Sequence, residues 1–593
     1  MNFSKFALSF GLLAFTSFGY TSQGSASATA GNLDGPAELP REAVKSSLAD
    51  TPSQGKTWMV RAGENIEHAL SQASCGDVVQ LQAGATFSGH IVMPAKNCDD
   101  QHWITIRTSA PDSSLPPEGK RVTPCYAGIG SLPGRPAWKC SSVANVLAKI
   151  EFNAKGGSGP FSFANGANHY RFIGLEITRA ASPATIYNLF EFQGTADHIV
   201  FDRLWLHGTA QDETVRGILL GGSRYVAVVD SFFTDFHCVA RSGACTDSQA
   251  IAGGIGENPM GPYKILNNFL EAAGENILFG GGHATMTPQD IEVRRNHMFK
   301  PMTWMVGQTG FVGGADGNGF IVKNLFELKN AQRVLLEGNI LEGSWGGFSQ
   351  VGFAVLLTPK NQEGRLGNLC PSCQVTDVTV RYNRISHVGA GMQIANGLSD
   401  KGAAALDGQR YSIHDITIDD MDAKKYNGAG EFAQVSMGLG AAVLKSVSIN
   451  HITAFPAKLL FIIGAQSSNG VRMENFIFTN NIVNAGIYPV WSTGTGGATN
   501  CAARNSPRPT FEACFNGYSF AGNVIIAAPN GGNWPNGNFF PSSAAGVKFV
   551  DYHDGNGGNY RLQNSSRYKR AGTDGRDIGA DIDAIDSAIA GVE

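Results

Sequence analysis

A short unit centred on an asparagine recurs along this chain and constrains the fold more than any other feature. Each copy has an apolar residue, two variable residues, the asparagine or a small polar residue, and a further apolar pair. Copies lie at residues 265–270, 293–298, 336–341, 380–385, 478–483 and 520–525. Repetition of one β-rich unit without a helical period predicts a β-solenoid. Asparagine tolerates left-handed backbone at a turn, and stacked asparagines can hydrogen-bond from coil to coil.

Length and composition agree with a solenoid. A chain of 593 residues would ordinarily suggest several domains. A solenoid escapes that limit because each coil packs only on its neighbours. Charged residues are only 16% of the chain and glycine contributes 74 residues, a balance that many tight turns and few surface helices would produce. An ordinary β-sandwich with asparagine in its turns is the alternative, but sandwiches do not repeat one unit along the whole chain.

The N-terminus has the pattern of an export signal over residues 1–30. Lys5 is followed by an apolar stretch at 6–18 and by small residues that suit cleavage. A buried N-terminal helix is the alternative. We expect a flexible linker at 31–57, which is rich in Ser, Pro, Ala and Gly, and a single solenoid domain at 58–593. No apolar run is long enough to cross a membrane, so we expect a secreted or periplasmic protein.

Ten cysteines, all outside the signal, fall into pairs that are close in sequence. In an oxidising compartment cysteines normally form disulfides. We predict the bridges Cys75–Cys98, Cys125–Cys140, Cys238–Cys245, Cys370–Cys373 and Cys501–Cys514. The fourth pair of this series, C-x-x-C at 370–373, also matches a redox motif or half a zinc site. A stapled loop is favoured there because no second C-x-x-C or paired histidine run supports zinc.

The formal net charge of −4 gives no sign of a nucleic-acid or membrane-surface partner. It does not exclude an acidic ligand, because a local basic groove can lie on a mildly acidic protein. We expect the protein to be a monomer.

Both ends of the repeat region resemble a known superfamily. Residues 60–63, then Ile66, Ala69, Leu70 and Ala73, then the Gly76–Asp77 turn, are similar to the entry segment of pectate-lyase-like right-handed parallel β-helix proteins. The stretch 559–581 resembles their closing segment. The resemblance implies a right-handed parallel β-helix whose open end is capped by an amphipathic helix at 66–73. It is weak for reaction, because the superfamily holds lyases, hydrolases, esterases, epimerases and adhesins.

One strand column of such a helix usually forms the floor of a groove. We align residues 190–193, 217–220, 275–279, 325–329, 354–360, 391–395 and 459–463 as that column. Strand alternation then points Glu327 and Lys329 outward. The same rule points Gln193 and Asn276 outward and places Glu275 at a strand edge. Lys360 follows Lys329 by one coil and a small loop. Carboxylates, amides and lysines on successive coils suit a uronic-acid polymer.

The segment 325–330, followed by Gly338–Asn339, also resembles the catalytic coil of the alginate lyase and chondroitinase B group. The resemblance implies that Lys329 is the base, that Glu327 and Glu275 are Ca²⁺ ligands, and that Lys360 replaces an assisting arginine. A lysine base needs a lowered pKa, which a second cation would provide and Glu327 alone would not. The alternative is that Glu327 and Lys329 form an exposed structural ion pair.

Two other functions remain open. A glycoside hydrolase of the same fold would use two carboxylates from Glu191, Asp247, Glu275 and Glu327. A non-catalytic carbohydrate-binding surface protein is the other. Trp304 and Trp345 lie in or near Gly-rich insertions, which would either wall the groove as sugar-binding residues or cover the flank of the solenoid. The histidines at 237, 283, 297 and 387 and the turn at 316–319 are weaker candidates, most often structural.

Overall fold

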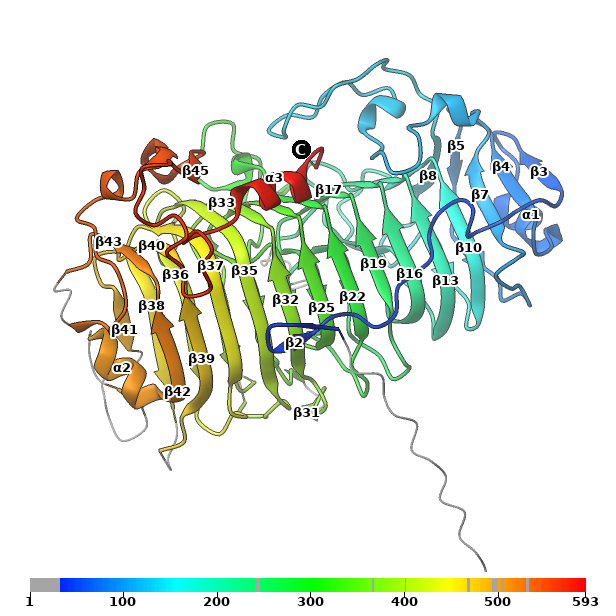
Figure 1. Cartoon of the computed structure of the whole chain (residues 1–593). Helices are drawn as coiled ribbons and strands as arrows, with labels where there is room; N and C mark the ends of the chain where they lie inside the picture. The colour runs from blue at the N-terminus through cyan, green and yellow to red at the C-terminus, as the bar shows by residue number, and fades with distance from the viewer. Residues whose placement is uncertain are drawn as a thin grey trace, which may run out of the picture.

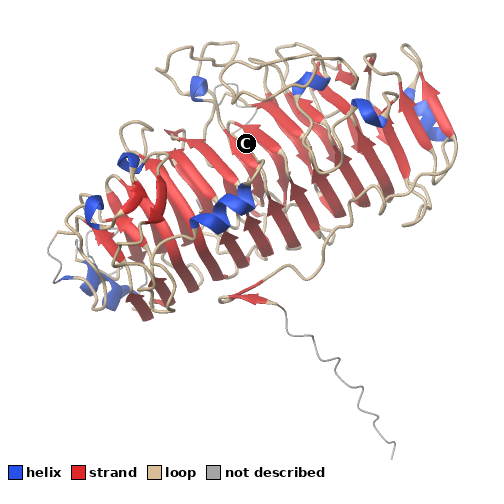
Figure 2. Cartoon of the chain, turned by 45° about the horizontal axis from the view of Figure 1, so that its top comes forward, coloured by secondary structure: helices blue, strands red, loops and turns tan. Residues whose placement is uncertain are grey.

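The structure, a computed structural model, is a right-handed parallel β-helix, as the asparagine repeat and the resemblance predicted. It describes residues 32–239, 246–364, 367–399, 401–466, 470–492, 500–502, 506–529 and 533–592. The predicted export signal at 1–30 lies outside the described residues. The coils form one elongated stack, with helix α1 (Ile66–Gln72) at one end and α2 (Pro507–Cys514) at the other (Figure 1). Helices are few and short, and most of the stack is strand (Figure 2).

Each coil contributes strands to three faces. The first face contains β3 (Thr57–Val60), β4 (Val78–Leu81), β7 (Ile104–Thr108), β10 (Ala167–Ile173), β13 (Thr195–Asp202), β16 (Gly222–Val229), β19 (Tyr263–Leu266), β22 (Gln289–Arg294), β25 (Ala331–Glu337), β32 (Val375–Arg381), β35 (Gly408–Met421), β37 (Lys445–Pro456), β39 (Met473–Thr479) and β42 (Phe515–Ala521). Neighbouring strands of this face pair in parallel, as Tyr170 with Ile199 shows.

The second face contains β5 (Thr86–Ser88), β8 (Ala148–Phe152), β11 (Leu175–Arg179), β14 (Trp205–His207), β17 (Phe232–Phe236), β20 (Phe269–Ala272), β23 (His297–Phe299), β26 (Ile340–Ser344), β33 (Arg384–Val388), β40 (Ile482–Asn484) and β43 (Val524–Ile526). The long strands β35 and β37 continue into it from the first face.

The third face is the predicted groove column. It contains β6 (Ile91–Met93), β9 (Phe161–Phe163), β12 (Ile186–Phe192), β15 (Thr214–Leu219), β18 (Gln249–Gly253), β21 (Glu275–Phe279), β24 (Phe326–Leu328), β29 (Phe353–Leu357), β34 (Ala390–Asn396), β36 (Glu431–Met437), β38 (Leu459–Ala465) and β41 (Val490–Ser492). All seven predicted segments belong to this sheet. Alternate side chains of its strands, such as Ile277, Phe326 and Val355, fill one continuous apolar core.

Stacked asparagines hold the turn between the first and second faces. The side-chain oxygen of Asn339 accepts from the backbone N–H of Asn296 at 2.9 Å and from its side chain at 3.1 Å. Asn383 does the same for Asn339, and Asn523 for Asn481. The predicted ladder is therefore confirmed. These buried amides are satisfied by one another, which removes the cost of leaving them without partners.

The ends of the solenoid follow the sequence pattern closely. Helix α1 begins after Asn65, whose side chain accepts from the N–H of His68 at 3.1 Å, and it buries Ile66, Ala69 and Leu70.

Four predicted disulfides are present: Cys75–Cys98, Cys125–Cys140, Cys370–Cys373 and Cys501–Cys514. The fifth, Cys238–Cys245, includes a residue outside the described ones.

The expected linker at 31–57 is not free of the solenoid. Residues 32–56 run across the outside of the first face, beginning with the hairpin β1 (Leu33–Asp34) and β2 (Ala37–Glu38) (Figure 1). Asp290 accepts from the backbone N–H of Arg41 at 2.8 Å, and the guanidinium of Arg171 donates to the carbonyl of Ser46 at 2.9 Å. Composition alone favoured flexibility, whereas polar partners on successive coils fix this N-terminal arm in place.

The segment after β43 folds back on the stack. It contains the antiparallel pair β44 (Phe549–Asp551) and β45 (Asn559–Leu562) and ends in α3 (Ile582–Ile589). Helix α3 packs Ile585 and Ile589 against Ile340 of β26. The remaining described strands form two short hairpins, β27 (Gly346–Gly347) with β28 (Gln350–Val351) and β30 (Glu363–Gly364) with β31 (Gly367–Asn368).

Candidate active site

Charged side chains gather where strands β18, β21 and β24 begin and end on the third face. The ammonium nitrogen of Lys329 lies 3.2 Å from Oε1 of Glu327. The side chain of Asn324 donates to Oε2 of the same glutamate at 2.6 Å. The two residues that strand alternation placed together are therefore an ion pair in the structure. Glu327 is buried, with 3% of its side chain exposed, and Lys329 retains 13%.

A second ion pair completes this cluster. Nζ of Lys323 lies 3.0 Å from Oδ2 of Asp247 and 3.5 Å from Oε1 of Glu275. Glu275 also accepts from Nε2 of Gln249 at 2.7 Å, and Gln249 accepts from Nε of Arg216 at 2.7 Å. These contacts exist because Arg216, Gln249 and Glu275 are in register on β15, β18 and β21. We call the set Arg216, Asp247, Gln249, Glu275, Lys323, Glu327 and Lys329 the charged cluster.

Lys360 lies on the coil after Lys329, as predicted. Its backbone N–H donates to the carbonyl of Lys329 at 3.2 Å. Glu327 is in register with Leu278 of the preceding coil and Leu356 of the following coil. Neither Glu275 nor Lys360 therefore lies directly opposite it. Gln193 is exposed just after β12, one strand from Arg216 on β15 and three strands from Glu275 on β21.

The expectation that Asn276 points outward is wrong. Its side chain is fully buried and donates to the carbonyls of Leu270 and Phe299 at 2.5 and 3.0 Å. Its oxygen accepts from the ammonium group of Lys300 at 2.8 Å. The reason is that Asn276 stands at the start of strand β21, where the buried carbonyls of Leu270 and Phe299 need hydrogen-bond donors. Asn276 is thus part of the turn structure and does not line a groove.

A pocket of about 410 Å³ opens next to the charged cluster. Its lining includes Val239, Trp304, Phe320, Trp345 and Phe348. The ring of Phe348 lies 5.9 Å from Nζ of Lys323, so the pocket and the cluster are contiguous. Both predicted tryptophans reach this pocket, but they are buried in its floor, with 1% and 4% exposed. Phe348, which is 59% exposed, is the aromatic ring that a ligand meets first.

The cluster shifts the pKa values of its members in opposite directions. Burial and the charge of Asp247 raise the pKa of Glu275 to about 7. Burial lowers the pKa of Lys329, but the charges of Glu327 and Glu275 together outweigh it and the net shift is upward. The pKa of Lys323 is raised in the same way, because the charges of Glu275 and Asp247 outweigh the effect of burial. Burial raises the pKa of Asp247, but its cationic neighbours, Lys323 first, lower it more, so it stays ionised.

A calcium ion does not fit these residues well. Ca²⁺ takes six to eight oxygen ligands, roughly, and usually several carboxylates. Here ammonium and amide groups already occupy the oxygens of Glu327 and Glu275. Within the described ranges, no group of three metal-binding side chains forms around either glutamate. Calcium dependence of the activity remains a prediction.

Sequence reasoning missed Lys323, Gln249 and Arg216, and it named Asp247 only as a candidate carboxylate of a hydrolase. Lys323 follows a long insertion, and Asp247 precedes β18 in another, so no strand periodicity relates them; they are 76 residues apart. Strand β18 was not among the predicted segments, which left out Gln249. Arg216 stood one residue before a predicted segment, and its place in the same register as Glu275 was the available signal.

The fold defines the class of protein, a right-handed parallel β-helix with a charged cluster on its third face. No family model and no curated protein matches the chain. Similar solved structures include pectate lyase Pel9A, with 12% identity, 90% of this chain and 97% of that chain covered, and a TM-score of 0.36. The alginate lyase from Paenibacillus sp. str. FPU-7 has 10% identity, covers 78% of this chain and 99% of that chain, and has a TM-score of 0.29.

The catalytic domain of GH87 alpha-1,3-glucanase, in complex with nigerose, has 11% identity, covers 88% of this chain and 70% of that chain, and has a TM-score of 0.35. At these values none of the likenesses bears on the activity of this chain. None of the helices in the described part of the chain is long and apolar enough to cross a membrane.

Proposed function

We propose that this protein is a carbohydrate-active enzyme that cleaves an acidic polysaccharide by β-elimination at the charged cluster. The observation that carries this proposal is the order of the charges. The side chains of Lys323 and Lys329 keep 10% and 13% of their surface, whereas Glu275 and Glu327 keep 0% and 3%. Asp247, at 19%, is the accessible carboxylate. The accessible part of the cluster therefore carries two ammonium groups and one carboxylate, a net positive charge that suits an anionic glycan.

Elimination divides naturally among these side chains. Lys323, whose raised pKa keeps it protonated, pairs with the carboxylate of the uronate and makes the neighbouring C–H more acidic. Lys329 takes that proton, the electron pair forms a carbon–carbon double bond, and the glycosidic C–O bond breaks toward the leaving sugar. Lys329 can do so only in its neutral form. Because its pKa is raised, the rate should increase with pH into the alkaline range.

The apolar pocket supplies the remaining requirement, a place for the sugar ring. The exposed ring of Phe348 stands beside Lys323, and the face of a sugar ring packs well on an aromatic ring. Binding there would hold the uronate carboxylate toward Lys323. The sugar, its linkage and its charge are all parts of this proposal. Export to an oxidising compartment is proposed on the disulfides. That the protein is a monomer remains a prediction.

A glycoside hydrolase is the second candidate, and one observation favours it. Glu275 has a pKa of about 7, while the pKa of Asp247 lies below its ordinary value, and both carboxylates lie within 3.5 Å of Nζ of Lys323. Carboxyl groups whose pKa values are pushed apart are typical of an acid and its partner. Against this reading, Glu275 is sealed from solvent and does not reach a substrate in this structure.

The test is a product assay on polyuronates and neutral glycans, with and without a Ca²⁺ chelator. An unsaturated, ultraviolet-absorbing product supports elimination. New reducing ends without that absorbance favour the hydrolase. Binding without either product leaves a non-catalytic carbohydrate-binding protein. Loss of the unsaturated product on addition of chelator would show that a metal takes part after all.

A further inference from the structure

Two histidines on neighbouring coils of the first face lie together with a carboxylate. His169 of β10 and His198 of β13 stack with ring centroids 4.5 Å apart. Oδ1 of Asp100 lies 3.2 Å from Nε2 of His169 and 3.7 Å from Nε2 of His198. The register places the rings there, because Asn168 pairs with Asp197 and Tyr170 with Ile199 on either side of them. This face is separate from the third face, which carries the charged cluster.

The hydrogen bonds determine which ring nitrogen of His169 carries its proton. The side-chain amide of Asn168 donates to the carbonyls of Lys96 and Gly166 at 2.7 and 2.9 Å, which fixes its nitrogen. Its oxygen therefore faces Nδ1 of His169, 2.8 Å away, and must accept a proton from it. In the neutral ring, Nε2 is then left with a lone pair.

His198 is oriented by the same logic. Its Nδ1 lies 2.9 Å from Oδ1 of Asp197, and a carboxylate oxygen can only accept. Its Nε2 likewise presents a lone pair toward Asp100. Nε2 of His169 is within hydrogen-bond distance of Asp100, and with both Nδ1 atoms donating, two imidazole nitrogens and a carboxylate oxygen converge in an arrangement that a bound cation satisfies. Histidines that bind metals usually donate their other ring N–H to a carboxylate or carbonyl in this way.

The spacing suits a small divalent ion. Ligand atoms about 2.0–2.2 Å from a tetrahedral zinc ion lie roughly 3.4 Å from one another. The two nitrogen-to-oxygen distances bracket that value, and the three ligand atoms all lie within 4.8 Å of one another. Because the two rings are parallel, each must tilt slightly for both lone pairs to meet one ion. A pocket of about 410 Å³, walled by Trp103, Tyr225 and the N-terminal arm, leaves room for a water ligand.

We propose that Asp100, His169 and His198 bind a divalent transition-metal ion of the zinc type. Two imidazole nitrogens and one carboxylate oxygen form a borderline donor set that favours Zn²⁺, Co²⁺ or Ni²⁺ over Ca²⁺ or Mg²⁺. Three protein ligands leave one position open to solvent. The ion joins the loop that carries Asp100 to two coils of the first face. This site is independent of the proposed elimination at the charged cluster.

The test uses the full mature chain without a histidine tag, freed of metal by chelation. Zn²⁺ is titrated by calorimetry, and Co²⁺ by its visible absorption. The wild type should bind one ion of each, and His198→Gln or Asp100→Asn should weaken binding by about tenfold or more. His102→Gln is the matched control, because His102 pairs with Asp99 alone on the same loop. Lys329→Ala should leave the binding constant unchanged.

The variants must remain folded for this comparison, so their circular dichroism and melting in chelator are measured against the wild type. His198 tolerates glutamine because 29% of its side chain is exposed. A wild-type chain that takes up no Zn²⁺ overturns the proposal. So does a His169→Gln, His198→Gln double variant that binds Zn²⁺ as tightly as the wild type. Loss of binding in His102→Gln alone would move the site to a different set of ligands.

Discussion

The first and third faces both carry ion pairs on successive coils, but the N-terminal arm bonds to those around Asp290 and Asp377 on the first face, whereas the charged cluster of the third face borders a pocket. On the first face Arg333 pairs with Asp290 at 2.7 Å and Arg410 with Asp377 at 2.6 Å. The N-terminal arm covers these pairs and completes them: Asp290 and Asp377 accept from backbone N–H groups of the arm. The chain itself supplies every partner that these carboxylates need.

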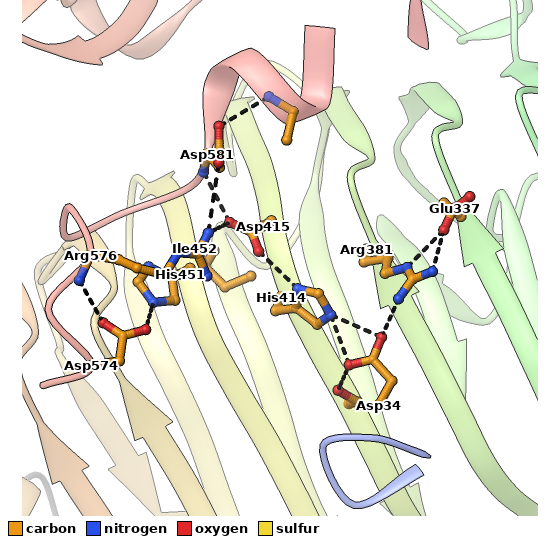
Figure 3. A network of polar contacts seen from close by, with 12 residues as sticks. Asp34, Glu337, Arg381, His414, Asp415, His451, Ile452, Asp574, Arg576 and Asp581 are labelled. Atoms are coloured by element: carbon orange, nitrogen blue, oxygen red, sulfur yellow. Dashed lines mark hydrogen bonds and ion pairs between the residues drawn. The ribbon is translucent and has the colours of Figure 1, made fainter. Parts of the chain in front are cut away.

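The N-terminal arm and the C-terminal segment both contact the first face and are joined there through His414 and Asp415 (Figure 3). Asp34 of the arm lies between Arg381 and His414, with Nε2 of His414 3.1 Å from its Oδ1. Asp415 bonds Nδ1 of His414 at 2.8 Å and also receives Arg576 of the C-terminal segment at 3.1 Å. Here the charges join the arm, the solenoid and the returning C-terminal segment into one structure.

The charged cluster of the third face is less complete. Oε1 of Glu275 and Oδ1 of Asn324 accept no hydrogen bond from the described residues, although Lys323 lies 3.5 Å from the former. Lys323, which pairs with two of its carboxylates, stands beside the pocket that Phe348 lines. A row of ion pairs along a solenoid is therefore not a binding site in itself. What sets the third face apart is polar atoms without a hydrogen-bond partner among the described residues, together with the pocket next to them.

The largest effect on activity is expected from Lys329→Ala. If Lys329 is the base, turnover should fall by about 10²–10⁴-fold while binding and folding persist. Lys329→Arg should fail as well, because a guanidinium does not release its proton. Lys149→Ala is the matched control, since Lys149 and Glu151 form the same i,i+2 strand pair, 3.1 Å apart, on the second face. Near-normal steady-state rates in Lys329→Ala would move the chemistry to the carboxylates.

On the covered face, His414→Gln should cost stability and not activity. Burial lowers the pKa of His414, but Asp34 and Asp415 raise it more, to about 9. Its contribution is therefore fully present below pH 6.5 and is lost as the pH rises through 9. The wild type should exceed the variant by roughly 3 kcal/mol in free energy of unfolding near pH 6, and the two should converge near pH 10. Denaturant titrations at both pH values measure this; a constant difference would contradict it.

Glu327→Gln tests how the charge of Glu327 on the third face affects the pKa of Lys329. The carboxylate of Glu327 contributes most to the upward shift in the pKa of Lys329. Its removal should move the ascending limb of the pH–rate profile, which follows the deprotonation of Lys329, toward lower pH by about one unit. Glu151→Gln, next to Lys149, serves as the control. A profile that stays in place while the maximal rate falls would mean that Glu327 only positions Lys329.

The smallest effect is expected from Glu275→Gln on stability. The pKa of Glu275 is raised to about 7 by burial first, so its stabilising contribution is complete below pH 4.5 and declines as the pH rises through 7. The variant should lose this dependence, and between pH 5 and 8 its stability should fall by about 2.5 kcal/mol less than that of the wild type. Melting curves across this range give the comparison. Parallel curves would indicate that Lys323 neutralises Glu275 throughout.

The sequence by itself determined the regular part of this protein. The asparagine repeat, the cap at 66–73, four disulfides and the third-face column are all local or periodic patterns. Strand alternation also brought Glu327 and Lys329 to one side of a strand, and one-coil spacing brought Lys360 beside them. Such features follow from a repeat in which each coil meets only its neighbours.

Tertiary structure alone decided what the irregular segments do. Asn276 turned inward because interior carbonyls at the turn needed its amide. Lys323 and Asp247 met across two insertions whose lengths follow no period. The N-terminal arm, polar enough to suggest a linker, docked because partners on distant coils were in place, and the loop with Asp100 reached His169 and His198 in the same way. Contacts between segments far apart in sequence depend on shape, and no local pattern encodes them.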